Sequence, residues 1–527
     1  MSVPDDPVGP APDAPALPVP TGRAVRRYTA AVARQRGGAS VGSLLVDVYS
    51  VLVTTAVGVG VAVGVVDAVR DSMPADAGAD LVGPEVSLPT LAGLLVLALA
   101  GAVLSLAGRL GPVGVGGAEA TWWLGLPVAR RGLLRPAATR LPVLAGAVGA
   151  VALPLLDLAL RDDGRPSPVR VATVAAVGGL GAAALVLGAG AGQSLGAVRR
   201  RIATVGDVLV ALVPVLALVS GVAGVHVDRV PAPPPGAVLA LLGVVVAAGV
   251  VLDHRLERIP ARELRESGSV ATQAVGALIS LDSRELGRTL TDGGRVRRRR
   301  RSSRLRVVRS PALALVTADA LLLVRSPRHL VQLAATAAVP TIVLAVPRLQ
   351  TPVIVLPALL VAGYVAMLAT AEGPRRAEMA PVVDRLLPIG ARRVRRLRMA
   401  VPAVAMLAWS LAALAPFAVL GGDLAGWWAL GAAAAPVWAG AAVRSAYRPA
   451  PDWSGPLVAT PAGALPLGAT VVLSRGPDVV VLGLVPVLVA VALGTVVPGM
   501  LVAQVVCSTV VVAVCGHLPD EPRTVTA

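Results

Sequence analysis

The sequence contains no lysine and no asparagine, and its 527 residues include one phenylalanine and two cysteines. Without lysine there can be no phosphate-binding loop of the Walker type and no lysine nucleophile. The two cysteines, Cys507 and Cys515, share one apolar run, and the four histidines are scattered. Neither a disulfide framework nor a metal site is therefore expected. The sequence predicts no catalytic residue and no cofactor, and if ATP drives this protein, a separate chain must hydrolyse it.

Charged residues are also scarce. They make up 15% of the chain, against 55% hydrophobic residues, and the mean hydropathy is +0.75. In soluble proteins roughly a quarter of the residues are charged. The apolar residues here fall into runs of about 20, the length of helix that crosses a hydrocarbon core of ~30 Å. The sequence therefore predicts an all-α, polytopic helical membrane protein.

About twelve transmembrane helices are predicted, as two pseudo-repeated halves of six. The expected spans of the first half are residues 41–66, 88–108, 141–160, 171–192, 206–225 and 236–252. Those of the second half are residues 329–346, 353–371, 399–420, 424–443, 456–473 and 479–497. A further apolar run, residues 500–515, follows Pro498-Gly499 and is either a thirteenth span or a re-entrant or extended end of the twelfth.

The segments outside the spans complete the domain organisation. The first 22 residues are rich in proline and alanine and lack the apolar core of a signal peptide, so the N-terminus is expected to be a disordered cytoplasmic tail. The predicted divisions are this tail (1–40), the first half (41–252), a cytoplasmic arginine-rich linker with an elbow helix (253–328), the second half (329–516) and a C-terminal tail (517–527).

All 48 basic residues are arginine, and they are distributed unequally between the predicted loops. With the N-terminus in the cytoplasm, the inner side of the predicted topology holds 41 arginines and the outer side holds seven. This is the asymmetry that the positive-inside rule requires. The scarcity of residues with AT-rich codons indicates a GC-rich bacterial genome. We therefore expect a multi-pass protein of the cytoplasmic membrane with a cytoplasmic N-terminus.

The densest arginine run, "RVRRRRRSSRLRVVR", occupies residues 295–309 of the linker. Nucleic acid is one partner that such a run can bind, but this run has no aromatic side chain on which bases stack. Anionic lipid headgroups fit better, since each arginine near a membrane surface adds about 1 kcal/mol. We expect membrane lipids, and no nucleic acid, as partners. The next segment, residues 312–329, is apolar but carries Asp319 and Arg325, and is expected to lie along the membrane interface as an elbow helix.

One signature occurs in both halves, in the cytoplasmic loop between the second and third spans. In the first half it reads Glu119, then Leu126-Pro127-x-x-Arg130-Arg131. In the second half it reads Glu378 and Asp384, then Leu387-Pro388-x-x-x-Arg392-Arg393. Proline suits the first turn of a short surface helix, from which the paired arginines would project toward an acidic partner. The alternative is that these arginines only anchor the topology. Internal duplication at half-length is typical of transporters.

The stretch "LGLPVARRGLLRP" resembles the cytoplasmic loop of type-2 ABC exporter permeases, where an acidic residue and then Leu-Pro-x-x-Arg precede the third span. The whole pattern resembles the fused form of that family, with both half-permeases in one chain. The resemblance implies a permease subunit, not itself an enzyme, that exports an unknown substrate with ATP hydrolysed by a separate ABC ATPase, expected as a dimer. The residues implied to dock the ATPase are Glu119, Leu126, Pro127, Arg130, Arg131, Glu378, Leu387, Pro388, Arg392 and Arg393.

A second resemblance concerns the segment from Arg444 to Gly483, which is similar to an uncharacterised domain-of-unknown-function family of permease-like membrane proteins from GC-rich bacteria. It names no substrate. Other functions therefore stay open. A non-transporting membrane scaffold or assembly factor is the main alternative. A lipid-modifying membrane enzyme is less favoured, because no Asp-x-x-Asp or similar acidic cluster lies on a predicted cytoplasmic loop. An ion-coupled transporter is also less favoured, because the predicted spans carry no series of mid-membrane carboxylates. Self-association is also open.

Overall fold

The computed structural model describes most of the chain between residues 20 and 517. The described ranges are 20–37, 41–73, 85–160, 166–227, 233–279, 308–379, 382, 384, 386–447, 456–460, 463–466 and 474–517. Within these ranges the chain is almost entirely helical, and eight of its helices are long and apolar enough to cross a membrane. The predicted fold class, a polytopic helical membrane protein, is confirmed.

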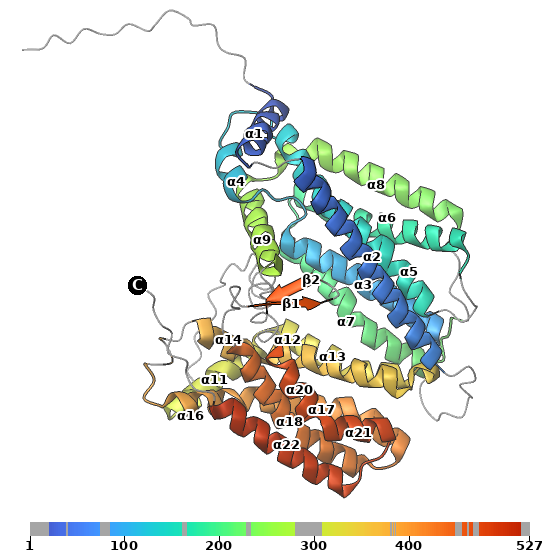
Figure 1. The fold of residues 1–527 in the computed structure, drawn as a ribbon, viewed down its shortest axis with the longest axis vertical. Helices are drawn as coiled ribbons and strands as arrows, with labels where there is room; N and C mark the ends of the chain where they lie inside the picture. Colours follow the sequence, from blue (N-terminus) through green and yellow to red (C-terminus); the bar gives the residue numbers. More distant parts are fainter. Residues whose placement is uncertain are drawn as a thin grey trace, which may run out of the picture.

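The described part of the chain before residue 280 contains six long helices and three shorter ones (Figure 1). The long helices are α2 (Val41–Ser72), α3 (Leu88–Leu110), α5 (Arg131–Ala159), α6 (Pro168–Ser194), α7 (Arg199–Ala223) and α8 (Pro235–Arg255), each overlapping one of the predicted spans. The shorter helices are α1 (Gly22–Gly37), α4 (Gly117–Trp123) and α9 (Ala261–Ile279), with one 3-10 turn, η1 (Leu256–Arg258), after α8.

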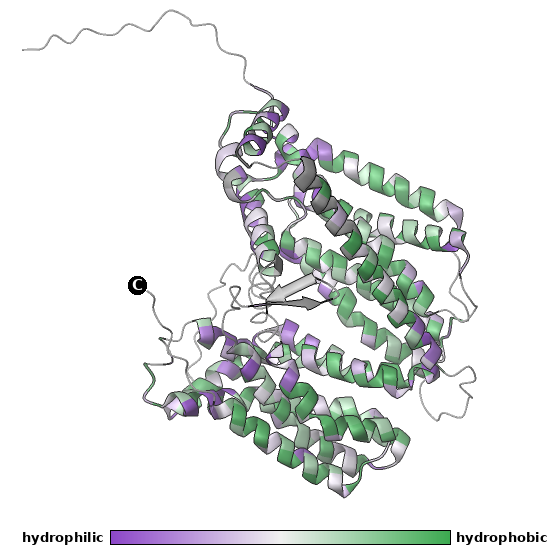
Figure 2. Cartoon of the chain, in the orientation of Figure 1, coloured by the Kyte–Doolittle hydropathy of each residue, from purple (hydrophilic) through white to green (hydrophobic). Residues whose placement is uncertain are grey.

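The second half repeats this order. Its elements are α11 (Pro311–Val324), α12 (Pro327–Leu344), η2 (Pro347–Leu349), α13 (Pro352–Thr370), α14 (Glu372–Met379), α16 (Ala391–Arg398), α17 (Ala400–Gly421), α18 (Leu424–Ala446), β1 (Leu457–Thr460), β2 (Gly463–Pro466), α20 (Pro477–Gly483), α21 (Val485–Leu493) and α22 (Pro498–His517). Figure 2 shows apolar residues along the long helices of both halves and polar residues gathered near their ends.

Local sequence sets several helix starts. At α3, α6 and α11 a serine side chain accepts a hydrogen bond from the backbone N–H three residues later, and a proline occupies the first turn. The serine satisfies an N–H that has no partner within the helix, and proline needs none there. The capping residues are Ser87, Ser167 and Ser310.

Small residues bring neighbouring helices into close contact. Gly149 of α5 faces Gly178 of α6 so closely that an added Cβ at Gly149 would lie 2.4 Å from the Gly178 carbonyl oxygen. Such close approach of backbones is the usual way membrane helices pack.

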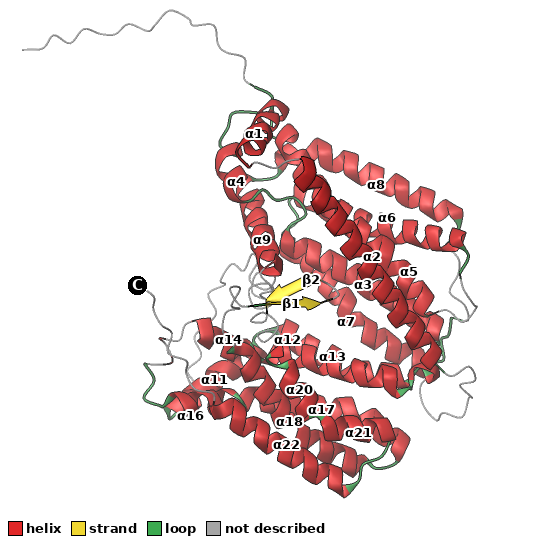
Figure 3. Ribbon diagram, in the orientation of Figure 1, coloured by secondary structure: helices red, strands yellow, loops and turns green. Residues whose placement is uncertain are grey.

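Two predictions about the chain were wrong. The N-terminal tail was expected to be disordered through residue 40, yet residues 22–37 form α1, with Thr21 Oγ1 accepting from the Ala24 N–H at its start. The eleventh predicted span, residues 456–473, contains an antiparallel hairpin that pairs Leu457 with Pro466 (Figure 3). Pro461, Gly463 and Pro466 interrupt this segment, and neither residue type favours the interior of a helix.

The sixth span of the second half is α22 instead, so the apolar run at 500–515 is a full helix of its own. The fifth is the pair α20 and α21, separated at Leu484. An ion pair of 2.6 Å between Arg444 Nη2 and Asp478 Oδ2 holds the start of α20 beside the end of α18. Arg475 therefore lies at the end of the bundle opposite to the one expected. Three of the eight helices long and apolar enough to cross a membrane lie in the second half: α13, α16 continued by α17, and α22.

The two halves meet in one apolar cluster that contains residues of both. Its buried members from the first half include Val86, Leu91 and Ala217, and those from the second include Ile342 and Val346. A backbone hydrogen bond of 2.9 Å from the Val86 N–H to the Ala345 carbonyl crosses the same boundary. These residues lie at the start of α3 and toward the ends of α7 and α12.

Candidate docking site

The two signature loops lie at the same end of the bundle. We define the first docking loop as residues 117–131 and the second docking loop as residues 372–393. Each follows the second span of its half and leads into the third, and Figure 1 shows α4 and α14 on the same side of the molecule. This end, the docking end, is opposite to the apolar cluster that joins the halves.

The first docking loop begins with α4 and passes through tight turns before α5 starts at Arg131. Backbone hydrogen bonds from Leu126 N to Trp123 O (3.2 Å) and from Val128 N to Leu126 O (2.9 Å) close these turns. The short helix therefore precedes Leu126-Pro127, and the prediction that Pro127 opens a surface helix was wrong. Proline in such a turn is favoured because its φ is already fixed.

The arginine end of the first docking loop is bound within the protein. Arg131 Nε donates to Asp253 Oδ2 at 3.0 Å, and Arg135 Nε donates to the other oxygen of the same carboxylate at 2.6 Å. The Arg131 N–H also points at Glu257 Oε1, at 3.4 Å. One carboxylate at the end of α8 thus holds two guanidinium groups at the start of α5. No sequence pattern indicates this pairing, because Arg131 and Asp253 are 122 positions apart in the chain.

Helix α1 covers the same arginine end. Arg26 Nη1 donates to the Gly132 carbonyl at 3.4 Å. An added Cβ at Gly22 would lie 2.6 Å from the Ala129 carbonyl oxygen, so the helix and the loop are in close contact. Arg130 is half-buried, with its Nη2 3.5 Å from the Leu124 carbonyl. Glu119 is also half-buried.

The tip of the first docking loop is apolar and exposed. Trp122 is 73% exposed, Leu126 is 38% exposed, and Pro127 is exposed beside them. Trp122 lies near the end of α4 and Leu126 in the turn that follows, so the two exposed apolar side chains are close in the sequence. Trp122 was not among the predicted site residues, although its place four residues before Leu126 was visible in the sequence.

Helix α9 packs against the segment that leads into the first docking loop. The Val115 N–H donates to the Leu264 carbonyl at 3.0 Å. An added Cβ at Gly268 would lie 2.0 Å from the Val115 carbonyl carbon, so only glycine allows this approach. Gly111 turns the chain with φ +81°, a conformation that favours glycine. The helix lies in the segment expected to be a linker, and its support of the loop was not predicted.

The second docking loop exposes both apolar and charged groups. Leu386 is 79% exposed, Pro388 is exposed and Leu387 is half-buried. Arg392 and Arg393 begin α16 and are exposed, and no carboxylate among the described residues pairs with either. Glu378, on α14, is half-buried. Residues 380, 381, 383 and 385 lie outside the described residues.

A buried ion triad fixes the end of the second docking loop. Arg398 Nη1 donates to Asp319 Oδ1 at 2.6 Å, and its Nη2 donates to Asp384 Oδ1 at 2.7 Å. Asp319 is only 4% exposed and lies on the elbow helix α11. An added Cβ at Gly373 would lie 2.4 Å from the Asp319 carboxylate, which places the start of α14 directly against it. A helix, α11, occupies residues 311–324 of the segment predicted to be an elbow helix, and Asp319 links it to Arg398.

The remaining arginines of α16 also have partners. Arg395 lies 5.0 Å from the centre of the Tyr447 ring, a cation–π distance. Burial raises the pKa of Tyr447 to about 12, so the phenol is neutral at physiological pH. Arg396 Nη2 lies 2.9 Å from His517 Nε2. Arg396 joins the start of the third span to the end of the sixth, as Arg135 and Asp253 do in the first half.

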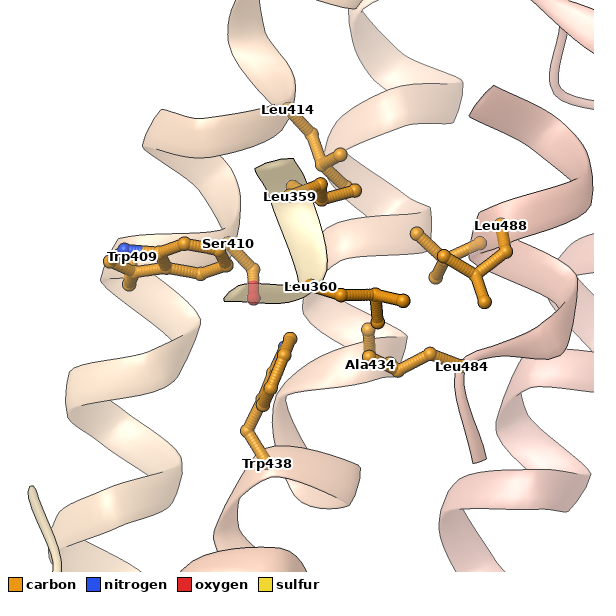
Figure 4. A pocket seen from close by; sticks show the side chains of 10 residues that line it. Leu359, Leu360, Trp409, Ser410, Leu414, Ala434, Trp438, Leu484 and Leu488 are labelled. Atoms are coloured by element: carbon orange, nitrogen blue, oxygen red, sulfur yellow. The ribbon is translucent and has the colours of Figure 1, made fainter. Parts of the chain in front are cut away.

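Among the described residues one apolar cavity of about 10 Å³ lies within the second half (Figure 4), lined by Leu359, Leu360, Trp409, Ser410, Leu414, Ala434, Trp438, Leu484, Val487 and Leu488. A volume of this size holds about one water molecule. No group of three His, Cys, Asp or Glu side chains suited to a metal ion occurs in the described part of the chain.

Comparison with known proteins yields one family. A family of unknown function (DUF6297) matches residues 84–456, a range that contains both docking loops. No curated protein and no solved structure matches the chain.

Proposed function

Because the chain belongs to the DUF6297 family of unknown function, we propose its function from the docking end: it is the membrane permease of an exporter powered by a separate ABC ATPase. In this proposal the twelve spans carry the transport pathway, and the two docking loops bind the ATPase subunits. The substrate is not specified by any residue described above.

One observation carries the proposal. Both halves present, at the same end and between the second and third spans, a short helix followed by an exposed loop with Leu-Pro and paired arginines. Each loop is also braced by helices outside the membrane spans, α1 and α9 for the first and α11 for the second. Arginines that only anchored topology would need neither exposed apolar tips nor such bracing. A rigid loop with apolar and charged groups is what a docking element requires.

We also propose that the docking end is cytoplasmic and that the protein lies in the cytoplasmic membrane. With the hairpin in place of the eleventh span, Arg475 joins the arginine-rich side. That side then holds 42 of the 48 arginines and the opposite side holds six. The arginine asymmetry thus supports a cytoplasmic N-terminus, close to α1.

A scaffold that binds other membrane proteins through the same loops is the alternative function. The two functions predict different proteins in the purified complex. A permease should co-purify with an ATPase that is labelled by the photoreactive nucleotide 8-azido-ATP, whereas a scaffold should not. The chain itself, which has no lysine, should hydrolyse no ATP when purified alone.

The decisive variant combines Trp122→Glu, Arg392→Glu and Arg393→Glu, all exposed positions in the docking loops. Loss of the apolar tip and reversal of charge should weaken the complex by about 2 kcal/mol or more, more than tenfold, at equal membrane levels. Val225→Glu is the matched control, because Val225 is 61% exposed at the opposite end. Unchanged recovery of the labelled ATPase with the triple variant would contradict the proposal.

A further inference from the structure

The two docking loops are chemically different, although their sequences repeat. In the first, Arg131 is held by Asp253 and Arg130 lies half-buried against a carbonyl, so the exposed tip is Trp122 with Leu126. In the second, Arg392 and Arg393 are exposed at the start of α16, beside Leu386. The first loop therefore offers an apolar contact and the second offers two guanidinium groups.

The difference follows from where the bracing helices lie. Helix α1 packs on Ala129 and Gly132, the arginine end of the first loop. Helix α11 binds Arg398 and packs on Gly373, which leaves the start of α16 open. The acid at the end of the sixth span completes the contrast: Asp253 binds Arg131 together with Arg135, whereas the corresponding helix α22 ends at His517, which contacts Arg396.

A partner built of two identical subunits presents two identical docking surfaces, related by its twofold axis. An apolar cleft suited to Trp122 does not neutralise Arg392 and Arg393, and an acidic surface suited to these arginines gains nothing from an indole. Specific partners match both the shape and the charge of a site, and mismatched charge is penalised. Two identical partner surfaces would therefore bind one of the two docking loops weakly.

Resting on the proposed function, we infer that the ATPase of this permease consists of two non-identical nucleotide-binding units, one with an apolar cleft for Trp122 and one with an acidic surface for Arg392 and Arg393. The units are two different chains or two unlike domains of one chain. Each is assigned to one half of the permease, so the complex assembles in a single orientation.

Two single-loop variants test this in the full-length protein, purified with its 8-azido-ATP-labelled partner at about 0.1 M and about 0.5 M salt. Trp122→Ala should lower ATPase recovery to a similar extent at both salt concentrations, because apolar contacts are not screened. Arg392→Gln with Arg393→Gln should lower it about tenfold at low salt and add little at high salt. The controls are Leu195→Ala, 64% exposed at the docking end, and Arg262→Gln, whose side chain is 83% exposed on α9.

The composition of the wild-type complex gives an independent readout. Mass measurement of the intact complex should find one permease with two different nucleotide-binding units. Two copies of one ATPase chain, or equal salt dependence for both single-loop variants, would overturn this inference and leave the proposed function intact. Absence of any labelled ATPase from the wild-type complex would instead overturn the proposed function itself.

Discussion

At the scale of single residues, the arginines of this chain have three different environments that their sequence context does not distinguish. Arg131 shares a carboxylate with Arg135, Arg398 is buried between two aspartates, and Arg392 is exposed. The repeated motif identified where the loops are, but not which of its arginines are available to a partner. For Arg131 this depends on Asp253, a residue whose role arises only when distant segments meet.

The Arg398 triad yields a prediction about stability. Arg398→Met should destabilise the folded protein by about 3–5 kcal/mol, because it leaves Asp319 charged and buried without its partner. Arg392→Met, six residues earlier on the same helix and exposed, should change stability by less than about 0.5 kcal/mol. Denaturant unfolding of the two variants in one detergent compares them directly. Equal stability would mean that the triad contributes nothing to holding α11 in place.

At the scale of elements, hydropathy predicted the long helices well and the interruptions poorly. The segment 456–473 has the average apolarity of a span, but an average does not register Pro461, Gly463 and Pro466, which break a helix. Conversely, Pro498-Gly499 leaves open from the sequence whether a separate helix follows, and Pro498 is the first residue of α22, where proline is well tolerated. The position of a proline within a run matters more than its presence.

Helix α9 gives the prediction at this scale. Gly268→Ala should force α9 away from the first docking loop, because the new methyl group would overlap the Val115 backbone. Limited trypsin digestion in membranes should then cleave faster at Arg262 and Arg265, and ATPase recovery should fall. Gly276→Ala on the same helix is the control, since its Cβ meets open space. The same cleavage rate in both variants would show that α9 is not held by this contact.

At the scale of the whole molecule, the two-half organisation could be predicted because length, period and arginine asymmetry are properties of the entire chain. The contrast between the halves could not. It comes from contacts such as that of Arg26 with Gly132, and neither of these residues belongs to the repeated signature. The repeated signature predicts where the two loops lie, and the contacts around each loop make the loops different.

The corrected topology is testable by labelling. Cysteines introduced at Thr460 and Arg475 should react with an impermeant thiol reagent only in inverted vesicles, because the hairpin and the start of α20 lie at the docking end. A cysteine at Val225 should react only in intact cells. Labelling of Arg475→Cys from outside would restore a span at residues 456–473. The native Cys507 and Cys515 are replaced by serine in all variants, and the unmodified background is measured.

The apolar cluster between the halves lies toward one end of the bundle, and the docking loops lie at the other. A helix of the length of α7, 25 residues, is about 38 Å long. Rotation of one half by about 10° around Val86, Ala217 and Ile342 would therefore displace its docking loop by roughly 6 Å. A small rotation of one half about this cluster therefore becomes a larger displacement at its docking loop, because the loop lies at the opposite end of the helices.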